Sequence, residues 1–438
     1  MDRSENKIGL WSAVGLGVGA MIGAGIFALM GQAGDIAGKA VYISFILGGI
    51  VAAISGYSLA KLGARFPAAG GIVEYLIQAF GVNVFTGGIS VMLYLASLIS
   101  LALLGKSFGS YGAALLNFKG SLFYTNIFAV SIIVLLGSIQ FFGVKKVVKF
   151  QNVAIIITIL ILVTFSVAGL IYMKPELMAP ALYPSSNKIL FSIAITFFSY
   201  EGFRIITNTA EDIVDPEKNL MKAIFISIGI TMVIYTALSF AVFGNLEVDK
   251  VIEAKDYALA EAARPAFGVF GFTIISIAAL FATSSSINAV LFATNNIAYQ
   301  MARNGQLPSF FANPIGKTRE GLLVSVVLTA LLILFLDLLQ IAAIGSITVL
   351  FIHAITHLGH LKLLKKTHAS KLLVVLALIT TLGVIVLFLL YSIKDSYTIL
   401  LLSGGVLMLS FLIELLIRAI TKRKVNKTKE GIFGEIFR

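Results

Sequence analysis

The stretch GLGVGAMIGAGIF, from Gly15 to Phe27, repeats glycine through an apolar segment. Two interpretations fit this spacing. Gly19 and Gly23 form a GxxxG pattern, which lets two membrane helices pack closely. Alternatively, the helix breaks at residues 23–25 and exposes backbone amides and carbonyls in the middle of the membrane. A second interrupted apolar segment favours the break.

That second segment, residues 189–210, is almost wholly apolar or small, yet it contains FFSYEGFR, from Phe197 to Arg204. Gly202 lies there between Glu201 and Arg204. A charge near the bilayer centre costs roughly 2.5–3.5 kcal/mol on insertion scales, so such residues face protein or water and are paired or functional. Interrupted helices at the first position of two five-helix groups indicate a secondary transporter with inverted repeats, which binds its substrate at the interruptions.

The composition places the whole chain in a membrane. Of the 438 residues, 58% are hydrophobic and 12% are charged, whereas about a quarter of the residues in soluble proteins are charged. A helix needs about 20 apolar residues to cross a bilayer of about 30 Å, and alternating barrel strands are not seen. We therefore predict an all-α polytopic membrane protein with twelve transmembrane helices, at residues 9–36, 40–60, 84–116, 124–143, 148–172, 188–210, 222–244, 268–302, 322–338, 340–362, 371–392 and 397–418.

Charge predicts the orientation. An even number of spans puts both termini on one side, and the lysines and arginines concentrate in the loops and tail of that side, which predicts that it is cytoplasmic. This distribution accounts for the net charge of +12 without a nucleic-acid partner. We expect a multi-pass protein of the cell membrane. The basic tail RAITKRKVNKTKEG is interpreted as a stop-transfer anchor, with binding of anionic lipid as the alternative.

The expected organisation follows from these spans. It comprises a cytoplasmic N-terminus at 1–8, a first five-helix repeat at 9–172, a second inverted repeat at 188–362, two peripheral helices at 371–418 and a cytoplasmic tail at 419–438. The chain has no cysteine, which excludes disulfides and thiolate chemistry. No cofactor or metal is expected, the lipid bilayer is the surrounding partner, and the oligomeric state is left open.

Four motifs carry a family resemblance. In chain order they are GAMIGAGIF at 19–27, ARFPAAGGIVEYLIQAFG at 64–81, FFSYEGFRIITNTAEDIVDPEKN at 197–219 and MARNGQLPSFF at 301–311. They resemble the signatures of amino acid permeases in the amino acid, polyamine and organocation transporter superfamily. The resemblance implies a leucine-transporter-like fold with two five-helix inverted repeats, broken first and sixth helices, two peripheral helices and alternating access.

A broken helix suits a zwitterion, because amides at the start of its second half bind a carboxylate and carbonyls ending its first half bind an ammonium. By resemblance, the amides of residues 23–25 take the carboxylate and the carbonyls of Met21, Phe198 and Glu201 take the ammonium. Phe198 would cover the substrate as a gate, or else pack against lipid. The implied substrate-binding residues are Met21, Ile22, Gly23, Ala24, Gly25, Phe198, Glu201 and Gly202.

A second cation site is implied between the first and eighth spans. Carbonyls of Gly19 and Ile22 could hold sodium with hydroxyls of ATSSSIN, residues 282–288, or those hydroxyls bond to their own backbone. Thr158 stands where some proton-coupled relatives have a lysine, so that lysine mechanism is not available. The residues implied in coupling are Gly19, Ile22, Thr158, Thr283, Ser286, Glu201 and Arg204.

Glu201 and Arg204 depart from the family pattern, and three interpretations remain open. The two form a static ion pair, or Glu201 carries protons under the control of Arg204, or Glu201 selects a cationic substrate. Lys106, in the outer part of the third span, could reach outward to the interface. The stripe of His353, His357 and His360 favours hydrogen-bonded histidines or proton traffic over a metal site, because one helix presents only two ligands easily.

The leading hypothesis is a secondary active importer of amino acids, driven by protons, with sodium as the other candidate ion. The alternative is a transporter or exchanger of cationic amino acids or polyamines. A channel is disfavoured because no filter or pore ring is seen. An enzyme is disfavoured because no nucleophile and base pair appears. ATP-driven transport is disfavoured because no GxxxxGK[ST] loop is present.

Overall fold

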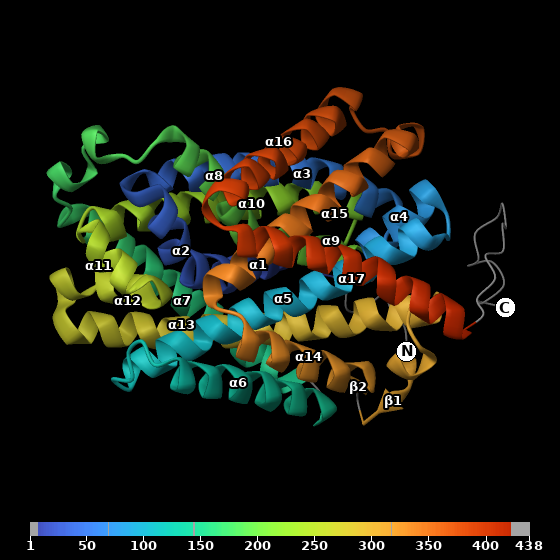
Figure 1. Cartoon of the computed structure of the whole chain (residues 1–438), viewed down its shortest axis with the longest axis horizontal. Helices are drawn as coiled ribbons and strands as arrows, with labels where there is room; N and C mark the ends of the chain where they lie inside the picture. The colour runs from blue at the N-terminus through green and yellow to red at the C-terminus, as the bar shows by residue number, and fades with distance from the viewer. Residues whose placement is uncertain (1–7, 69, 143–144, 317, 422–438) are drawn as a thin grey trace.

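The computed structural model describes residues 8–68, 70–142, 145–316 and 318–421. Residues 1–7 of the predicted N-terminus and residues 422–438 of the predicted basic tail lie outside the described residues. Long helices run side by side along the horizontal axis of Figure 1. α4 lies at the right end of this bundle and α11 and α12 lie at the left end, so these two sets of helices mark its opposite ends.

The helices of the first half follow the predicted spans closely. They are α1 (Leu10–Met21), the π-helical segment η2 (Ile22–Ile26), α2 (Phe27–Ala37), η3 (Gly38–Ala40), α3 (Val41–Arg65), α4 (Ile72–Phe80), α5 (Val84–Leu115), α6 (Leu122–Phe142) and α7 (Lys145–Ile171). Gly81, with φ 75°, ends α4, and the Asn83 side chain accepts the Thr86 amide at 2.9 Å to start α5. This turn between α4 and α5 thus has the left-handed glycine and the N-cap that a sharp reversal needs.

The second half continues in the same way. Its elements are η4 (Pro175–Met178), η5 (Pro180–Leu182), α8 (Ser186–Ser199), α9 (Phe203–Asn208), η6 (Ala210–Asp212), α10 (Pro216–Phe243), α11 (Val248–Glu253), η7 (Lys255–Tyr257), α12 (Ala258–Ala262), α13 (Arg264–Arg303), η8 (Ser309–Ala312), the paired strands β1 (Pro314–Ile315) and β2 (Thr318–Arg319), α14 (Gly321–Phe335), α15 (Leu338–Thr367), α16 (Lys371–Asp395) and α17 (Tyr397–Thr421). α3 packs along α8 and α10, and α5 packs along α13 and α15.

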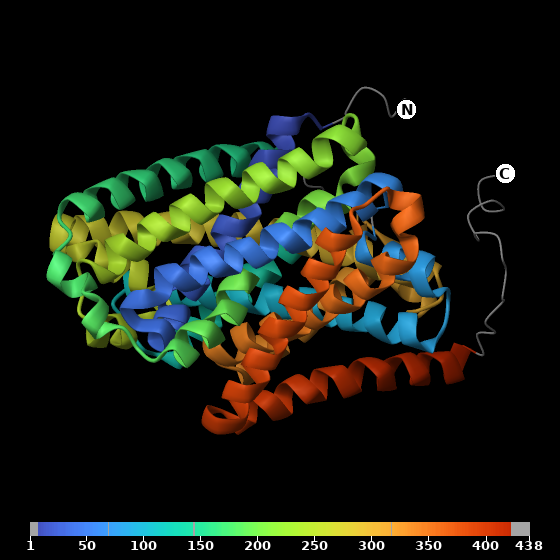
Figure 2. The same cartoon turned by 90° about the horizontal axis from the view of Figure 1, so that it is seen from above.

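Within the described residues, nine helical stretches are long and apolar enough to cross a membrane, and three apolar helices are shorter, at Leu10–Met21, Ile155–Ile171 and Gly321–Phe335. The chain is therefore a multi-pass membrane protein. Its predicted twelve crossings and inverted repeats stay predictions. α17, red in Figure 2, lies along one edge of the bundle and exposes large apolar side chains, including Met408 and Leu412.

The boundary between the ninth and tenth predicted spans is set by a capping box. The Asp337 carboxylate accepts the Gln340 amide at 2.8 Å, and the Gln340 side chain accepts the Asp337 amide at 3.1 Å. Leu336 is extended, with φ −118° and ψ 146°. Since both first-turn donors are satisfied by these side chains, α15 starts at Leu338, two residues before the predicted start of that span.

A short helical segment covers α2 at the left end of Figure 1. This cover consists of α11, η7 and α12, residues 248–262. The Gln32 amide donates to Asp256 at 2.7 Å, and the Lys255 ammonium donates to Asp35 at 2.9 Å. A β-carbon added at Gly31 would lie 2.0 Å from the Lys255 carbonyl oxygen. Glycine at this position therefore lets the cover lie directly on α2.

Burial in the cover raises the pKa of the Asp256 carboxyl above its ordinary value, and the charge of Asp337 adds to the rise. The Gln32 hydrogen bond and the charges of Lys255 and Lys106 act in the opposite direction. The docked cover therefore binds a proton at Asp256 more readily than the solvated cover does. Docking is favoured as the pH falls through the range between the solvated and the docked pKa of Asp256.

Candidate substrate and coupling site

The first interruption is a π-helical segment. Residues 22–26, IGAGI, leave α-helical hydrogen bonding between α1 and α2, while the flanking Met21 and Phe27 keep helical torsions (φ −67° and −70°). Single π-helical turns inside α-helices frequently mark functional sites. The predicted interruption at Gly23, Ala24 and Gly25 thus takes the form of a changed hydrogen-bond register in a continuous helix.

The second interruption is a pair of tight turns between α8 and α9. The Glu201 amide donates to the Phe198 carbonyl at 3.1 Å and the Arg204 amide donates to the Glu201 carbonyl at 3.0 Å. A β-carbon at Gly202 would lie 2.5 Å from the Met21 nitrogen. Gly202 is therefore needed where the two interruptions cross, because backbone leaves no room for a side chain.

Tyr235 of α10 joins the two interruptions, and sequence reasoning did not single it out. Its hydroxyl donates to the Met21 carbonyl at 2.6 Å and to the Ser199 carbonyl at 3.2 Å. A tyrosine in the middle of an apolar span gives no signal of this role, because its partners lie on other helices. The structure places a buried hydroxyl beside a carbonyl that was predicted to bind the substrate ammonium.

The predicted carbonyl ligands lie at the two interruptions, and each already accepts one hydrogen bond. Met21 accepts from Tyr235, Phe198 accepts from the Glu201 amide, and Glu201 accepts from the Arg204 amide. A carbonyl oxygen has two lone pairs. A substrate ammonium at these oxygens therefore shares them with donors that are already present.

Phe198 is buried and points into the protein. Its ring lies against Gly345 of α15, where an added β-carbon would come within 2.6 Å of the ring. Ile99 of α5 also borders Gly345. The interpretation of Phe198 as a lipid-facing residue is therefore wrong. Its ring lies between the helix that carries the second interruption and the neighbouring helices α5 and α15.

Two of the residues predicted for a second cation site, Gly19 and Ser286, lie together. Ser286 of α13 donates to the Gly19 carbonyl at 3.4 Å, which brings these two residues together. Thr283 instead donates to Ala279 of its own helix at 2.6 Å, as the alternative interpretation expected. Thr158 is buried on α7, three residues after Ile155, whose side chain lies against Gly19.

Glu201 and Arg204 form a buried ion pair despite the interruption between them. The Arg204 Nε donates to Glu201 Oε1 at 2.5 Å, and both residues are 7% exposed. The other carboxylate oxygen, Oε2, lies 3.4 Å from His353 Nε2, and neither atom makes a hydrogen bond. The rings of Phe197 and Phe203 flank His353 at centroid distances of 5.6 and 6.0 Å. One oxygen of the carboxylate is therefore hydrogen-bonded to Arg204, and the other lies near His353 without a hydrogen bond.

Lys106 does not reach outward. Its side chain is buried, and its ammonium donates to the Asn126 side chain of α6 at 2.7 Å. The outward interpretation was wrong because a hydrogen-bond acceptor on the neighbouring helix lies within reach. This lysine ties α5 to α6.

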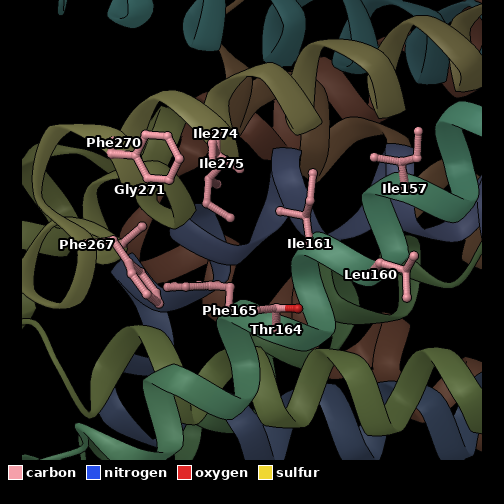
Figure 3. Close-up of a pocket in the computed structure, with 11 residues that line it drawn as sticks. Ile157, Leu160, Ile161, Thr164, Phe165, Phe267, Phe270, Gly271, Ile274 and Ile275 are labelled. Atoms are coloured by element: carbon pink, nitrogen blue, oxygen red, sulfur yellow. The ribbon is translucent and has the colours of Figure 1, made fainter.

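Apolar grooves lie away from the interruptions. Figure 3 shows one of about 320 Å³ between α7 and α13, lined by Ile157, Leu160, Phe267 and Phe270 with Thr164 as a polar member. Phe270 is 70% exposed and Leu160 is 61% exposed. A groove with these walls faces lipid and offers a zwitterion no charge complement.

Comparison with known proteins decides the family. The amino acid permease family model matches residues 8–437. The chain belongs to the amino acid permease family. The permease is 32% identical to the inner membrane transport protein YbaT of Escherichia coli over 98% of each chain. It is 30% identical to the methylthioribose transporter of Bacillus subtilis, over 68% of this permease and 67% of that protein.

A solved structure shows the same fold. The crystal structure of the manganese transporter of Eremococcus coleocola matches the permease with a TM-score of 0.59, covering 94% of this chain and 95% of that one at 14% identity. The family predicted from the four motifs is confirmed, and the permease is a membrane transporter of that superfamily. Its family and the named relatives are transporters and not enzymes.

Proposed function

We propose that this permease is a secondary active transporter that imports amino acids together with protons by alternating access. The observation that carries the proposal is the buried Glu201 carboxylate at the crossing of the two interruptions. Arg204 holds one of its oxygens, and His353 faces the other. A carboxylate that exchanges Arg204 for a proton as the helices move couples proton entry to transport.

The substrate lies where the π-helical segment and the α8–α9 turn cross. The amides of residues 23–25 bind the carboxylate, because the π-helical turn takes this segment out of the α-helical hydrogen-bond pattern. The ammonium binds the carbonyls of Met21, Phe198 and Glu201, and at Met21 it competes with the Tyr235 hydroxyl. The Phe198 ring closes the site against α15.

Neutral amino acids fit this site better than cationic amino acids or polyamines. A second ammonium needs a free carboxylate, and Glu201 already bonds to Arg204 at 2.5 Å. Protons fit better than sodium. Sodium needs several oxygen ligands, and of the two hydroxyls predicted for that site only Ser286 reaches a first-span carbonyl, whereas Thr283 bonds to its own helix.

The proposed orientation places the protein in the cell membrane with both termini in the cytoplasm. The last turn of α15 carries Lys365 and Lys366, and this end of the helix lies near the end of the bundle that carries α4. Positive residues near the ends of membrane helices favour the cytoplasmic side. The cover over α2 then lies on the outer side.

Transport by purified protein in liposomes tests the proposal. Labelled neutral amino acids, cationic amino acids and polyamines are presented under an imposed pH or sodium gradient. We expect concentrative uptake of a neutral amino acid under the pH gradient. Uptake that ignores both gradients and needs counter-substrate inside would show an exchanger instead.

The Glu201→Gln variant tests the coupling group. We expect it to abolish pH-driven uptake while counterflow exchange survives, because exchange needs no net proton movement. The matched control is Glu261→Gln, since Glu261 also pairs with an arginine three residues later, Arg264, at 2.7 Å. Loss of both activities with intact substrate binding would assign Glu201 a purely structural role.

A further inference from the structure

Two serines of α3 and three histidines of α15 form a continuous row of hydrogen bonds inside the membrane. Ser55 Oγ lies 2.9 Å from His353 Nδ1 and 2.9 Å from His357 Nε2. Ser58 Oγ lies 2.9 Å from His357 Nδ1 and 2.8 Å from His360 Nδ1. Each hydroxyl therefore bridges two imidazoles.

The row ends at Thr367, the last residue of α15. His360 Nε2 lies 2.9 Å from Thr367 Oγ1. The two serines and three histidines are completely buried, and Thr367 is 6% exposed. We name His353, Ser55, His357, Ser58, His360 and Thr367 the His–Ser chain. Such a row of polar groups is costly to bury unless its members are satisfied, and here each member bonds to the next from His353 Nδ1 to Thr367.

We propose that the His–Ser chain is a proton wire that carries protons between Glu201 and the end of α15 predicted to be cytoplasmic. This inference rests on the proposed coupling role of Glu201 and adds the route by which its proton leaves. An imidazole suits the task because it accepts a proton on one nitrogen and gives one from the other. His357 and His360 have both nitrogens within hydrogen-bond distance of a chain hydroxyl.

The transfer balances at each step. A protonated Glu201 gives its proton to His353 Nε2, and the proton on His353 Nδ1 passes to the Ser55 oxygen. The Ser55 hydroxyl proton passes to His357 Nε2 at the same time. Glu201 ends as a carboxylate and His353 ends neutral in the opposite tautomer. His357 stays neutral because the proton on its Nδ1 leaves in the same concerted shift.

The second half repeats the exchange. The proton on His357 Nδ1 passes to the Ser58 oxygen, the Ser58 proton passes to His360 Nδ1, and the proton on His360 Nε2 reaches Thr367. Thr367 then releases one proton to water. Before transfer its hydroxyl donates to the Leu363 carbonyl, and afterwards it donates to His360 Nε2. Tautomer exchange and rotation of the three hydroxyls reset the chain.

The wire has a gap at its inner end. Glu201 Oε2 and His353 Nε2 are 3.4 Å apart, and both are buried atoms without a hydrogen-bond partner. A hydrogen bond of this type needs about 2.7–3.2 Å. The gap is therefore where the wire disconnects when Arg204 holds Glu201.

Neighbouring charges act at both ends of the chain. Glu201, which pairs with Arg204, faces His353, and Lys61, one turn beyond Ser58 on α3, places a positive charge near His360. A lasting imidazolium is costly among these apolar walls and beside Lys61, so a concerted shift through neutral imidazoles suits the chain. Within the described residues, no group of three histidine, cysteine or acidic side chains is arranged to hold a metal ion.

Proton flux and amino acid uptake in liposomes test the wire. Ser55→Ala removes one relay oxygen, and Ser58→Ala removes the next. We expect each to lower pH-driven uptake and substrate-dependent proton flux at least tenfold while counterflow exchange stays within twofold of the unmodified protein. Ser55→Thr, which restores the hydroxyl, should recover most of the flux.

The matched control is Ser44→Ala. Ser44 is also a buried serine of α3 and bonds across to α8 through the Ile189 carbonyl at 3.0 Å, but it lies outside the chain. It should leave both activities unchanged. His357→Phe fills the space of the imidazole without a nitrogen and should block proton flux. This variant covers the case in which a water replaces the lost hydroxyl of Ser55→Ala or Ser58→Ala and keeps the flux.

Two results overturn the inference. If the Ser55→Ala and His357→Phe variants both keep more than half of the proton flux, protons take another route. Loss of counterflow together with flux in the serine variants, with Ser44→Ala intact, shows a structural role. Absence of substrate-dependent proton flux in the unmodified protein refutes the proposed function itself, so the two failures are distinguishable.

Discussion

Replacing Arg204 by methionine removes the guanidinium from the buried ion pair and keeps a side chain of similar length. The charged groups are 2.5 Å apart, and the Arg204 and Glu201 side chains are 9% and 8% exposed. Removing one partner from a buried pair costs about 3–5 kcal/mol, because the other charge stays buried without compensation. His353, at 3.4 Å from the second oxygen, offsets part of this cost. We therefore expect the low end, about 3 kcal/mol.

A double-mutant cycle measures this interaction. Glu201→Gln should cost a similar amount, whereas the double variant should lie close to the unmodified protein, because no buried charge of the pair remains. The coupling free energy, the amount by which the two single costs together exceed the cost of the double variant, is then about 6 kcal/mol, a factor of roughly 10⁴ in the unfolding equilibrium. Reversible unfolding by SDS in mixed micelles provides the free energies.

The control cycle uses Glu261 and Arg264. They have the same spacing and lie 2.7 Å apart, but their side chains are 23% and 31% exposed. Exposed pairs contribute about 0–1 kcal/mol, so their coupling should stay under about 1 kcal/mol. Equal, small coupling in both cycles would refute the desolvated pair at the α8–α9 turn and, with it, the reasoning that Arg204 controls Glu201.

Three further outcomes are expected. Gly202→Ala should abolish uptake and counterflow, since its β-carbon would lie 2.5 Å from a backbone atom at the first interruption. Gly404→Ala, with open space around it, should keep both activities. Equal transport by the two variants would contradict the close approach of the two interruptions at Gly202. Tyr235→Phe should lower the free energy of unfolding by about 1–3 kcal/mol, because a buried carbonyl loses its donor; an unchanged value argues against that bond. The chain has no cysteine, so an Ala258→Cys variant places one thiol in the cover, and its labelling rate is divided by that of the same variant carrying Asp256→Asn. This ratio should fall as the pH falls, because docking of the cover takes up a proton at Asp256. A ratio that does not change with pH counts against proton-linked docking.

The sequence predicted the helices well because hydrophobic length decides where a chain can cross a membrane. It also located both interruptions, since Gly23, Gly25 and Gly202 stand where backbone approaches backbone. It misplaced the boundary after α14, because the capping box of Asp337 and Gln340 extends α15 by side-chain bonds that hydropathy does not register. The form of the first interruption, a π-helical turn, depends on packing against Ser286 and Tyr235.

The site was predictable only where its residues are neighbours in the chain. Glu201 and Arg204 stand three residues apart, so their pairing could be weighed from spacing alone. Ser55 and His353 come from opposite halves of the protein. Their contact depends on the packing of α3 on α15, which the sequence around either residue does not reveal. The histidine stripe signalled polar contacts along one face of α15. Its partners remained invisible because serine is common in membrane helices and usually bonds to its own backbone.

The geometry around Glu201 sets how much motion coupling requires. Glu201 lies on the turn that crosses the first interruption, so a substrate bound at the proposed site would act directly on the segment that carries the carboxylate. His353 lies on a different helix, 3.4 Å from Glu201 Oε2. Closing that gap to a hydrogen bond needs a shift of about 0.5 Å. A small movement of the α8–α9 turn relative to α15 is therefore enough to connect the carboxylate to the His–Ser chain, and in the proposed mechanism the larger rocking of the helices serves the substrate rather than the proton.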